Sequence, residues 1–347
     1  MSIYKRLMSF LSWSVAVAAL FFASPLRAQD GEGGTTSPGS SATRKTSGGA
    51  AFLRLGAGAK AQGMGRARTA HAGGDFSAAF WNPAGLGEVK RPGAVISGRF
   101  LQDSAFDTQF FTGIAASPIA QQGAAAIGVL YYGVGDIEAF DARANYQGTF
   151  RNSEMALAGT YGISQGPISI GAGIRYHLQE FSGEGLTNEL SGAATRNSGL
   201  GFDLGLLYRI NRRFTVGMVL RDGTDIGEED YMPTGFTLGV GYLHTLRRDT
   251  WIRGAVDLEQ IKDRPIRVHL GTEYSRKMQD LKFAVRLGLS DIYLEDRAPA
   301  QARGEIPTGN NKFTVGFGLG KDWYGIDVAY IGDGLDDTVL LSLTLSR

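Results

Sequence analysis

Cysteine is absent from the sequence, which excludes disulfide bonds and any metal site built on thiolates. Neither sign of charge dominates, because 35 Lys and Arg residues stand against 34 Asp and Glu residues. A balanced chain has no overall field to attract nucleic acid, so no nucleic-acid partner is predicted. No nucleophile motif frames the serines, and the four histidines lack the spacing of metal ligands. The sequence therefore predicts a protein that is not an enzyme, with no catalytic residue, cofactor or metal.

Glycine, by contrast, is abundant, with 50 of the 347 residues, about twice the ordinary usage of ~7%. The glycines follow no three-residue period, which excludes collagen. Many stand inside strand-like stretches, where glycine normally weakens a strand. We expect such glycines where the inner wall of a barrel must stay small or bend.

The N-terminal 28 residues have the three parts of a secretory signal peptide. Lys5 and Arg6 form the positive start, residues 11–22 form a short apolar core, and Ala28 ends the expected cleavage site. The apolar core is shorter than a membrane-spanning helix requires, although an uncleaved anchor is the alternative. Residues 29–49 contain almost no apolar side chain and predict a flexible, disordered linker.

From Pro92 onward, apolar residues occupy every second position over stretches of about ten residues. For example, Ile170 and Ile174 share one face, whereas Arg175 and His177 share the other. This two-residue period predicts β-strands with one apolar face. Stretches of ten residues or more are typical of strands that cross a membrane, since soluble strands most often have about five or six residues.

The polar face carries too much charge for the dry core of a soluble sandwich. We predict that it lines a wet lumen. Its charged residues are Arg175, Asp203, Arg209, Arg267, Glu273, Lys282 and Arg286. Gly205 lies on the same face, so a Gly205→Ser substitution is expected to be mild.

About fourteen strands are expected between residues 92 and 347, from 93–101 to 337–346. Short connections alternate with long polar stretches, which lie around residues 135–149, 182–196, 222–233 and 291–310. An even number of strands, with short turns at one end and long loops at the other, predicts an all-β, antiparallel outer-membrane barrel. The even count places both ends of the barrel on the side of the short turns, which is the periplasmic side.

Residues 50–91 precede the barrel and lack its alternation. We therefore predict a small N-terminal plug with short helical turns, seated in the lumen. The carboxylate of Asp75 can cap a short helix over residues 76–81, because it can accept the free backbone N–H groups of the first turn.

The stretch AAFWNPAGLG, residues 78–87, predicts a bend within the plug. Asn82 precedes a proline and is driven out of the helical conformation, so it can cap a second turn that begins with Pro83. Three apolar side chains are then expected to project as wedges and to line any transport pocket: Phe80, Trp81 and Leu86.

Residues 51–89 resemble the N-terminal signature of the PorV/PorQ outer-membrane proteins, a branch of the FadL-like barrels. The resemblance rests on LGAGAKAQGMG (residues 55–65), on an acidic residue and on WNPAGL (residues 81–86). The residues that carry it are Gly63, Met64, Gly65, Asp75, Phe80, Trp81, Asn82, Pro83 and Gly85. The family implies a fourteen-stranded barrel with an N-terminal plug. The sequence departs from the family at Arg347, because such barrels usually end on an aromatic residue.

The resemblance implies one of two functions in the outer membrane, where the barrel would contact lipid and lipopolysaccharide. The main expectation is an accessory of type IX-like protein secretion that binds exported cargo or neighbouring secretion-system components. The alternative is a FadL-like passive transporter of long-chain fatty acids or other hydrophobic small molecules. A plain porin or structural barrel is disfavoured by the plug.

Gly133 and Gly135 stand at the end of the third expected strand and are candidates for a bend in the barrel wall. Alternatively, they end the strand before a long loop. A bend would matter for transport, because a plugged barrel passes a solute only if the plug shifts or the wall opens sideways.

Overall fold

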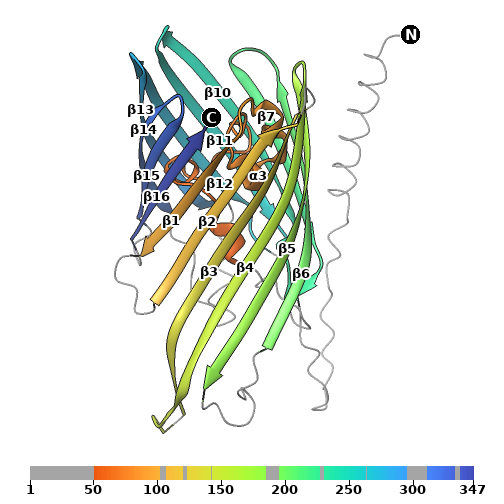
Figure 1. Cartoon of the computed structure of the whole chain (residues 1–347), viewed down its shortest axis with the longest axis vertical. Coiled ribbons are helices and arrows are strands. Elements are labelled where there is room, and N and C mark those ends of the chain that lie inside the picture. The colour runs from red at the N-terminus through yellow and green to blue at the C-terminus, as the bar shows by residue number, and fades with distance from the viewer. Residues whose placement is uncertain are drawn as a thin grey trace, which may run out of the picture. The chain divides into compact units, whose positions relative to one another are not determined.

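The computed structural model describes residues 51–101, 107–119, 123–141, 143–184, 195–226, 230–262, 264–294, 311–332 and 337–347. These residues form a closed antiparallel barrel of fourteen strands with short helices inside it (Figure 1). The expected signal peptide (1–28) and linker (29–49) lie outside the described residues, as does most of the expected loops at 182–196 and 291–310. No helix in the described ranges is long and apolar enough to cross a membrane.

The barrel strands follow one another around the wall, and each pairs with its neighbours in sequence until the first meets the last. They are β1 (Gly93–Leu101), β2 (Asp107–Pro118), β3 (Ala124–Phe140), β4 (Tyr146–Gln165), β5 (Ile168–Glu184), β6 (Thr195–Arg209), β7 (Phe214–Gly223), β10 (Gly235–Arg247), β11 (Thr250–Ile261), β12 (Arg267–Met278), β13 (Leu281–Tyr293), β14 (Lys312–Lys321), β15 (Tyr324–Gly332) and β16 (Thr338–Ser346). A two-stranded ribbon, β8 (Asp225–Ile226) with β9 (Asp230–Tyr231), lies within the connection expected around 222–233.

The predicted fold class, an all-β barrel of about fourteen strands with a small plug, is confirmed. The barrel closes between β1 and β16, whose register pairs Gly93 with Ser346 and Leu101 with Thr338. The strand ends at Gly93 and Ser346 therefore share one rim, which we call the terminal end. The opposite rim is called the loop end.

The hairpin of β3 and β4 differs from the prediction. A long loop was expected over residues 135–149, but β3 continues to Phe140 and β4 begins at Tyr146. Cross-strand pairs such as Ile137 with Phe150 extend the ladder, and the rings of Phe140 and Tyr146 meet edge to face at 5.9 Å. The polar residues of this stretch resemble a loop in sequence, yet pairing with a long partner strand keeps them extended.

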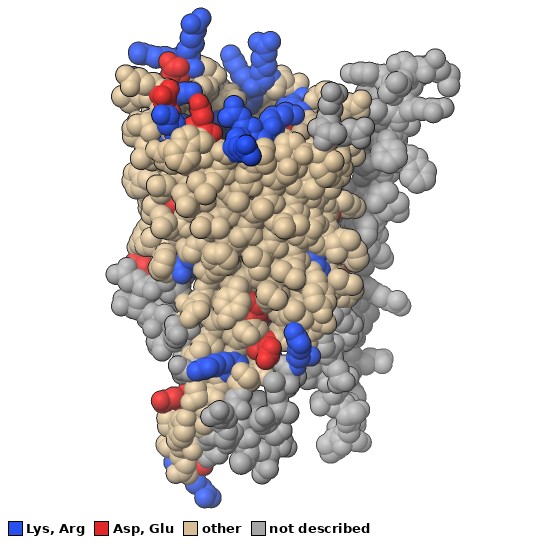
Figure 2. Space-filling model, viewed as in Figure 1, with Lys and Arg blue, Asp and Glu red and all other residues tan. Residues whose placement is uncertain are grey.

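The predicted strand faces are confirmed by burial. Ile170, Ile174 and Leu204 are 49%, 55% and 58% exposed on the outer wall, whereas Arg175 and His177 are buried. Figure 2 shows a broad uncharged band around this face, with charged residues toward the two ends. A soluble monomer rarely exposes a continuous apolar surface of this size, so the exterior suits lipid.

The lumen is drier than the sequence predicts. Its charges are buried in ion pairs: the guanidinium of Arg286 lies 2.7 Å from a carboxylate oxygen of Glu273 and 2.7 Å from one of Asp327. Arg175 pairs with Asp203 in the same way. Because the plug fills the space that water would occupy, these charges must neutralise one another rather than be solvated.

Candidate functional site

The plug consists of four short helices: η1 (Ala51–Leu55), α2 (Ala59–Gly63), α3 (Ala78–Trp81) and η2 (Pro83–Glu88). Its backbone touches the barrel wall directly where glycines face each other. A methyl group added at Gly63 would lie 2.9 Å from the Cα atom of Gly316 on β14. Gly65 has a φ of 59° and packs on the backbone of Leu289, so a side chain there would be strained and obstructed. Met64, between them, is buried.

Asn82 joins the plug to the wall and caps η2. Its side-chain nitrogen donates to the carbonyl oxygens of Thr69 (2.8 Å) and of Leu206 on β6 (3.2 Å). Its side-chain oxygen accepts the backbone N–H of Ala84 at 3.1 Å, and Pro83 is the first residue of η2. The cap predicted from the Asn-Pro step is therefore present, and the same side chain also fixes the plug to β6.

Two further residues of the motif hold the plug together internally. The indole N–H of Trp81 donates to the carbonyl oxygen of Ala57 at 2.7 Å, and the ring lies over Gly56. Gly85 packs tightly on Ala72, next to a backbone hydrogen bond from Gly74 to Gly85 of 3.0 Å. These contacts tie α3 and η2 to earlier turns of the plug.

Asp75 is an ionic centre, whereas the helix cap predicted for it is not formed: the N-cap of α3 is Ser77, without a side-chain cap hydrogen bond. One of its carboxylate oxygens lies 3.0 Å from Lys60 and 2.9 Å from Arg68, and the other accepts the backbone N–H of Ser77 at 2.9 Å. Burial alone would raise the pKa of Asp75, but the two cations outweigh it and hold the pKa well below its usual range. The helix expected over residues 76–81 begins later, at Ala78.

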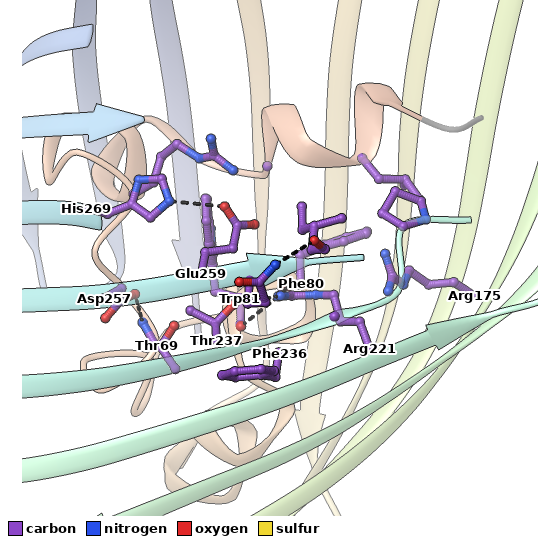
Figure 3. Close-up of a pocket in the computed structure, with 17 residues that line it drawn as sticks. Thr69, Phe80, Trp81, Arg175, Arg221, Phe236, Thr237, Asp257, Glu259 and His269 are labelled. Carbon is purple, nitrogen blue, oxygen red and sulfur yellow. Dashed lines mark hydrogen bonds and ion pairs between the residues drawn. The ribbon is translucent and has the colours of Figure 1, made fainter. Parts of the chain in front are cut away.

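A small cavity opens between the plug and the loop-end half of β10, β11 and β12, and we call it the loop-end cavity (Figure 3). Its volume is about 60 Å³, and Phe80, Trp81 and Phe236 supply part of its apolar lining. Arg221 closes one side by donating to the carbonyl oxygens of Phe80 (3.0 Å) and Trp81 (3.1 Å). Leu86, expected in this pocket, is instead fully buried between plug and wall.

A larger cavity of about 420 Å³ lies between the plug and the terminal-end halves of β1 and β13 to β16, and we call it the terminal-end cavity. Phe76, Val89 and Val95 form part of its apolar lining. Gly58 and Lys60 face this cavity, whereas Gly56 faces the loop-end cavity. The chain around Ala57 therefore separates the two spaces.

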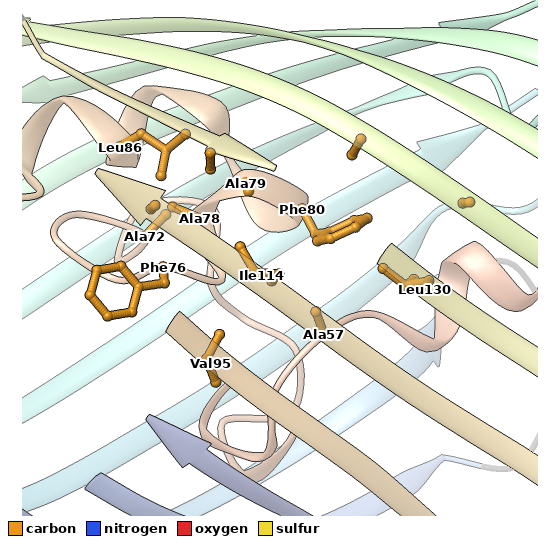
Figure 4. Close-up of a cluster of buried hydrophobic side chains, with 14 of the residues drawn as sticks. Ala57, Ala72, Phe76, Ala78, Ala79, Phe80, Leu86, Val95, Ile114 and Leu130 are labelled. Atoms are coloured by element: carbon orange, nitrogen blue, oxygen red, sulfur yellow. The ribbon is translucent and has the colours of Figure 1, made fainter. Parts of the chain in front are cut away.

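One apolar cluster runs along the β1 to β4 side of the lumen (Figure 4). It joins the plug residues Phe76 and Phe80 to wall residues such as Val95, Ile114 and Leu130. Because Phe80 also lines the loop-end cavity and Phe76 also lines the terminal-end cavity, the cluster reaches both spaces. The ion pairs of the lumen lie mainly on β5 to β15, with Glu154 on β4 pairing with His177 on β5, so the lumen has an apolar side and an ionic side.

Gly133 and Gly135 lie beside an irregularity in the ladder between β3 and β4. Val134 pairs with Asn152, but the next pair is Ile137 with Phe150, so β3 carries one extra residue there. The strand does not end at these glycines. This local break is of the β-bulge kind, which bends a strand and disrupts pairing.

Several plug contacts were not identified from the sequence. The backbone N–H groups of Arg68 and Thr69 both donate to one carboxylate oxygen of Asp257 on β11, each at 2.8 Å. Arg66 pairs with Asp291 on β13 at 3.2 Å. The sequence offered only a single acidic residue on the lumenal face of each strand, and such a residue does not indicate which plug residue it contacts.

These features define a class of protein: a closed barrel with its lumen filled by the segment that precedes the first strand. No family model matches the sequence, and no curated protein matches it. Many solved structures do. The chain is similar to a monoaromatic hydrocarbon channel, the TodX deltaS2S3 mutant, at 13% identity and a TM-score of 0.58, over 84% of this chain and 99% of that one.

Two further channels give a similar result. The FadL homologue of Pseudomonas aeruginosa matches at 12% identity and a TM-score of 0.52, over 82% of this chain and 97% of that one. The toluene transporter TbuX of Ralstonia pickettii matches at 11% identity and a TM-score of 0.55, over 84% and 97%. At these identities the likeness establishes the fold, a closed barrel of this architecture, and nothing finer.

Proposed function

We propose that this protein is an outer-membrane channel through which small hydrophobic molecules cross passively. The observation that carries the proposal is the apolar cluster between the plug and β1 to β4, which reaches a cavity on each side. A plug that only sealed the barrel would need no apolar connection between two cavities. The similar solved structures are named as hydrocarbon channels and toluene transporters, which supports the same function.

A hydrophobic solute gains about 0.8 kcal/mol for each methylene group that it moves from water to an apolar surface. The apolar cluster would therefore attract such a solute without any energy source. The loop-end cavity of about 60 Å³ is smaller than the ~300 Å³ at which ligand pockets usually begin. Passage thus requires a local movement, and Trp81 is the residue placed to allow it, because its indole holds the chain that separates the cavities.

The bulge at Gly135 offers a second route, sideways through the wall between β3 and β4. The ladder is already interrupted there. The inner wall beside it, around Leu130 and Tyr132, belongs to or packs against the apolar cluster. A solute leaving by this route would enter the membrane without displacing the plug.

The secretion role implied by the PorV/PorQ resemblance has weaker support. The residues that carry the resemblance, such as Gly63, Gly65 and Asn82, attach the plug to the wall. Any plugged barrel needs such contacts, so these residues do not favour secretion over transport. The solved structures favour transport.

Uptake of radiolabelled toluene and of a labelled fatty acid by intact cells tests the proposal. Cells would carry the wild type, Trp81→Ala, Trp323→Ala or an empty vector. Uptake by wild-type cells should exceed uptake by vector cells. Trp81→Ala should raise uptake several-fold, because the chain around Ala57 that separates the cavities loses its hydrogen bond from the indole. Trp323 is 57% exposed in the turn between β14 and β15 and lines neither cavity, so its substitution should leave uptake unchanged. Wild-type uptake of both compounds at the vector level would end the transport proposal.

A further inference from the structure

The terminal-end cavity has a strong excess of positive charge. Six cationic side chains line it: Lys60, Lys90, Arg91, Lys282, Arg286 and Lys321. Only three carboxylates line it: Asp75, Glu88 and Asp327. The lining therefore carries a net charge of three positive, whereas the whole chain carries only one.

The three carboxylates are already occupied by close cations. Asp75 pairs with Lys60, and Asp327 lies 2.7 Å from Arg286. Glu88 pairs with an arginine that is not part of the cavity lining. No carboxylate of the lining is thus left to neutralise the remaining cations.

Three of the cations have no such partner. The side chains of Lys90, Arg91 and Lys282 make no hydrogen bond and no ion pair with any residue that the structure describes. Lys282 is also repelled by the charges of Lys60 and Arg286, while Glu273 attracts it. Like charges that converge in a concave space with low-dielectric walls attract and concentrate anions.

The cavity also has the size and the apolar surface of a small-molecule site. Its volume is about 420 Å³, within the ~300–1,000 Å³ usual for ligand pockets. Phe76, Val89 and Val95 supply apolar surface in the same space as the unpaired cations. A ligand that contacts both the unpaired cations and the apolar surface must carry a negative group and a short apolar part.

We propose that the terminal-end cavity binds a small organic anion, with its carboxylate or phosphate group at Lys282, Lys90 and Arg91. The apolar part of the ligand lies against Phe76 and Val95. The proposal does not depend on transport, because it concerns a binding site that opens at the terminal end. Figure 2 shows that the same end of the barrel carries a concentration of Lys and Arg side chains, which would draw anions to it.

Calorimetric titration of the full mature protein in phosphatidylcholine nanodiscs tests this site. The probes are hexanoate, hexyl phosphate and hexanol, which share one short chain and differ in the head group. At least one anion should bind saturably, and hexanol should bind tenfold or more weakly, as expected for the loss of a charged hydrogen bond. The two anions distinguish a carboxylate site from a phosphate site.

Lys282→Gln removes the charge and leaves a polar side chain one atom shorter, and it should weaken anion binding about tenfold. Lys277→Gln is the matched control, since Lys277 lies outside the cavity and pairs with Asp322 at 3.8 Å. Heat-modifiable migration on gels would show that both variants are folded. Absence of saturable anion binding, equal binding of hexanol, or full binding by folded Lys282→Gln would overturn the proposal. The uptake assay measures transport separately, so the two proposals can fail independently.

Discussion

One methyl group added at Gly205 is expected to loosen the plug without unfolding the barrel. The new Cβ atom would lie 2.9 Å from both the backbone nitrogen of Ala84 and the Cδ atom of Pro83, and closer still to the side-chain oxygen of Asn82. The Ala84 and Pro83 atoms belong to the backbone and to a rigid ring, and the Asn82 side chain is held by three hydrogen bonds, so the plug must move away from β6. The alternation of the sequence alone predicts a mild effect at this position, and the packing predicts the opposite.

The magnitude follows from two contributions. Overpacking of a filled interior costs about 1–3 kcal/mol. Displacement of Asn82 also weakens its 3.2 Å hydrogen bond to Leu206, which contributes about 0.5–1.5 kcal/mol. Gly205→Ala should therefore weaken plug docking by roughly 1.5–4.5 kcal/mol. The barrel itself keeps its ladder, because alanine is compatible with the extended backbone of β6.

Leak conductance of the purified protein in planar bilayers measures the effect directly. Gly205→Ala should show larger or more frequent conductance steps than the wild type, with normal heat-modifiable migration. Gly159→Ala on β4 is the matched control, because an added methyl group there has nothing within 4 Å. If the conductance of Gly205→Ala equals that of Gly159→Ala, the plug does not depend on this close packing.

Two further predictions concern the outer wall and pH. Leu204→Arg should reduce the amount of folded barrel in membranes, because a lipid-facing arginine at midplane costs about 2–4 kcal/mol; Leu204→Phe should assemble normally, and equal assembly of both would contradict a lipid-facing position. Burial lowers the pKa of His71 to about 4, so below about pH 6.5 a released plug takes up a proton that the docked plug does not. Docking of the plug is therefore most stable above that pH and weakens as the pH falls toward 4. Protease resistance of the plug, compared at pH 7 and pH 5, would detect this, and His71→Gln should be equally resistant at both. Equal resistance of the wild type at the two pH values would refute the dependence of docking on His71.

The strands could be predicted from the sequence because the physical signal is local. A strand places successive side chains on opposite faces, so the residue types alone predict that Ile174 faces the lipid and Arg175 faces the lumen. The predicted end of β3 was wrong because it also relied on local sequence alone. Gly133 and Gly135 look locally like a strand end, but pairing with β4 extends the strand to Phe140.

The filling of the lumen could not be predicted in this way, because its contacts join residues far apart in the chain. Arg66 meets Asp291, and Thr69 meets Asp257. A polar face in the sequence does not reveal whether water or another segment covers it. Asn82 is an intermediate case: its cap on η2 is local and predictable, whereas its bond to Leu206 is not.

A buried ion pair of the plug should be more sensitive to the loss of a single charge than a surface pair, and Asp75 is the residue at which to test this. Asp75→Asn removes the shared partner of Lys60 and Arg68, and the side chain of Arg68 is only 4% exposed.

Loss of one partner from a buried pair costs about 3–5 kcal/mol, whereas a surface pair contributes about 0–1 kcal/mol. Asp322→Asn is the matched control, since Asp322 is 70% exposed and pairs with Lys277 on the surface. Both variants lose the same charge, yet only Asp75→Asn should increase leak conductance and protease cleavage of the plug. The same pairs hold the pKa of Asp75 well below its usual range, so its charge is retained as the pH falls and acid at pH 5 should not imitate the substitution through this residue. Equal leak from Asp75→Asn and Asp322→Asn would mean that backbone packing at the glycines holds the plug without any contribution from its ionic side.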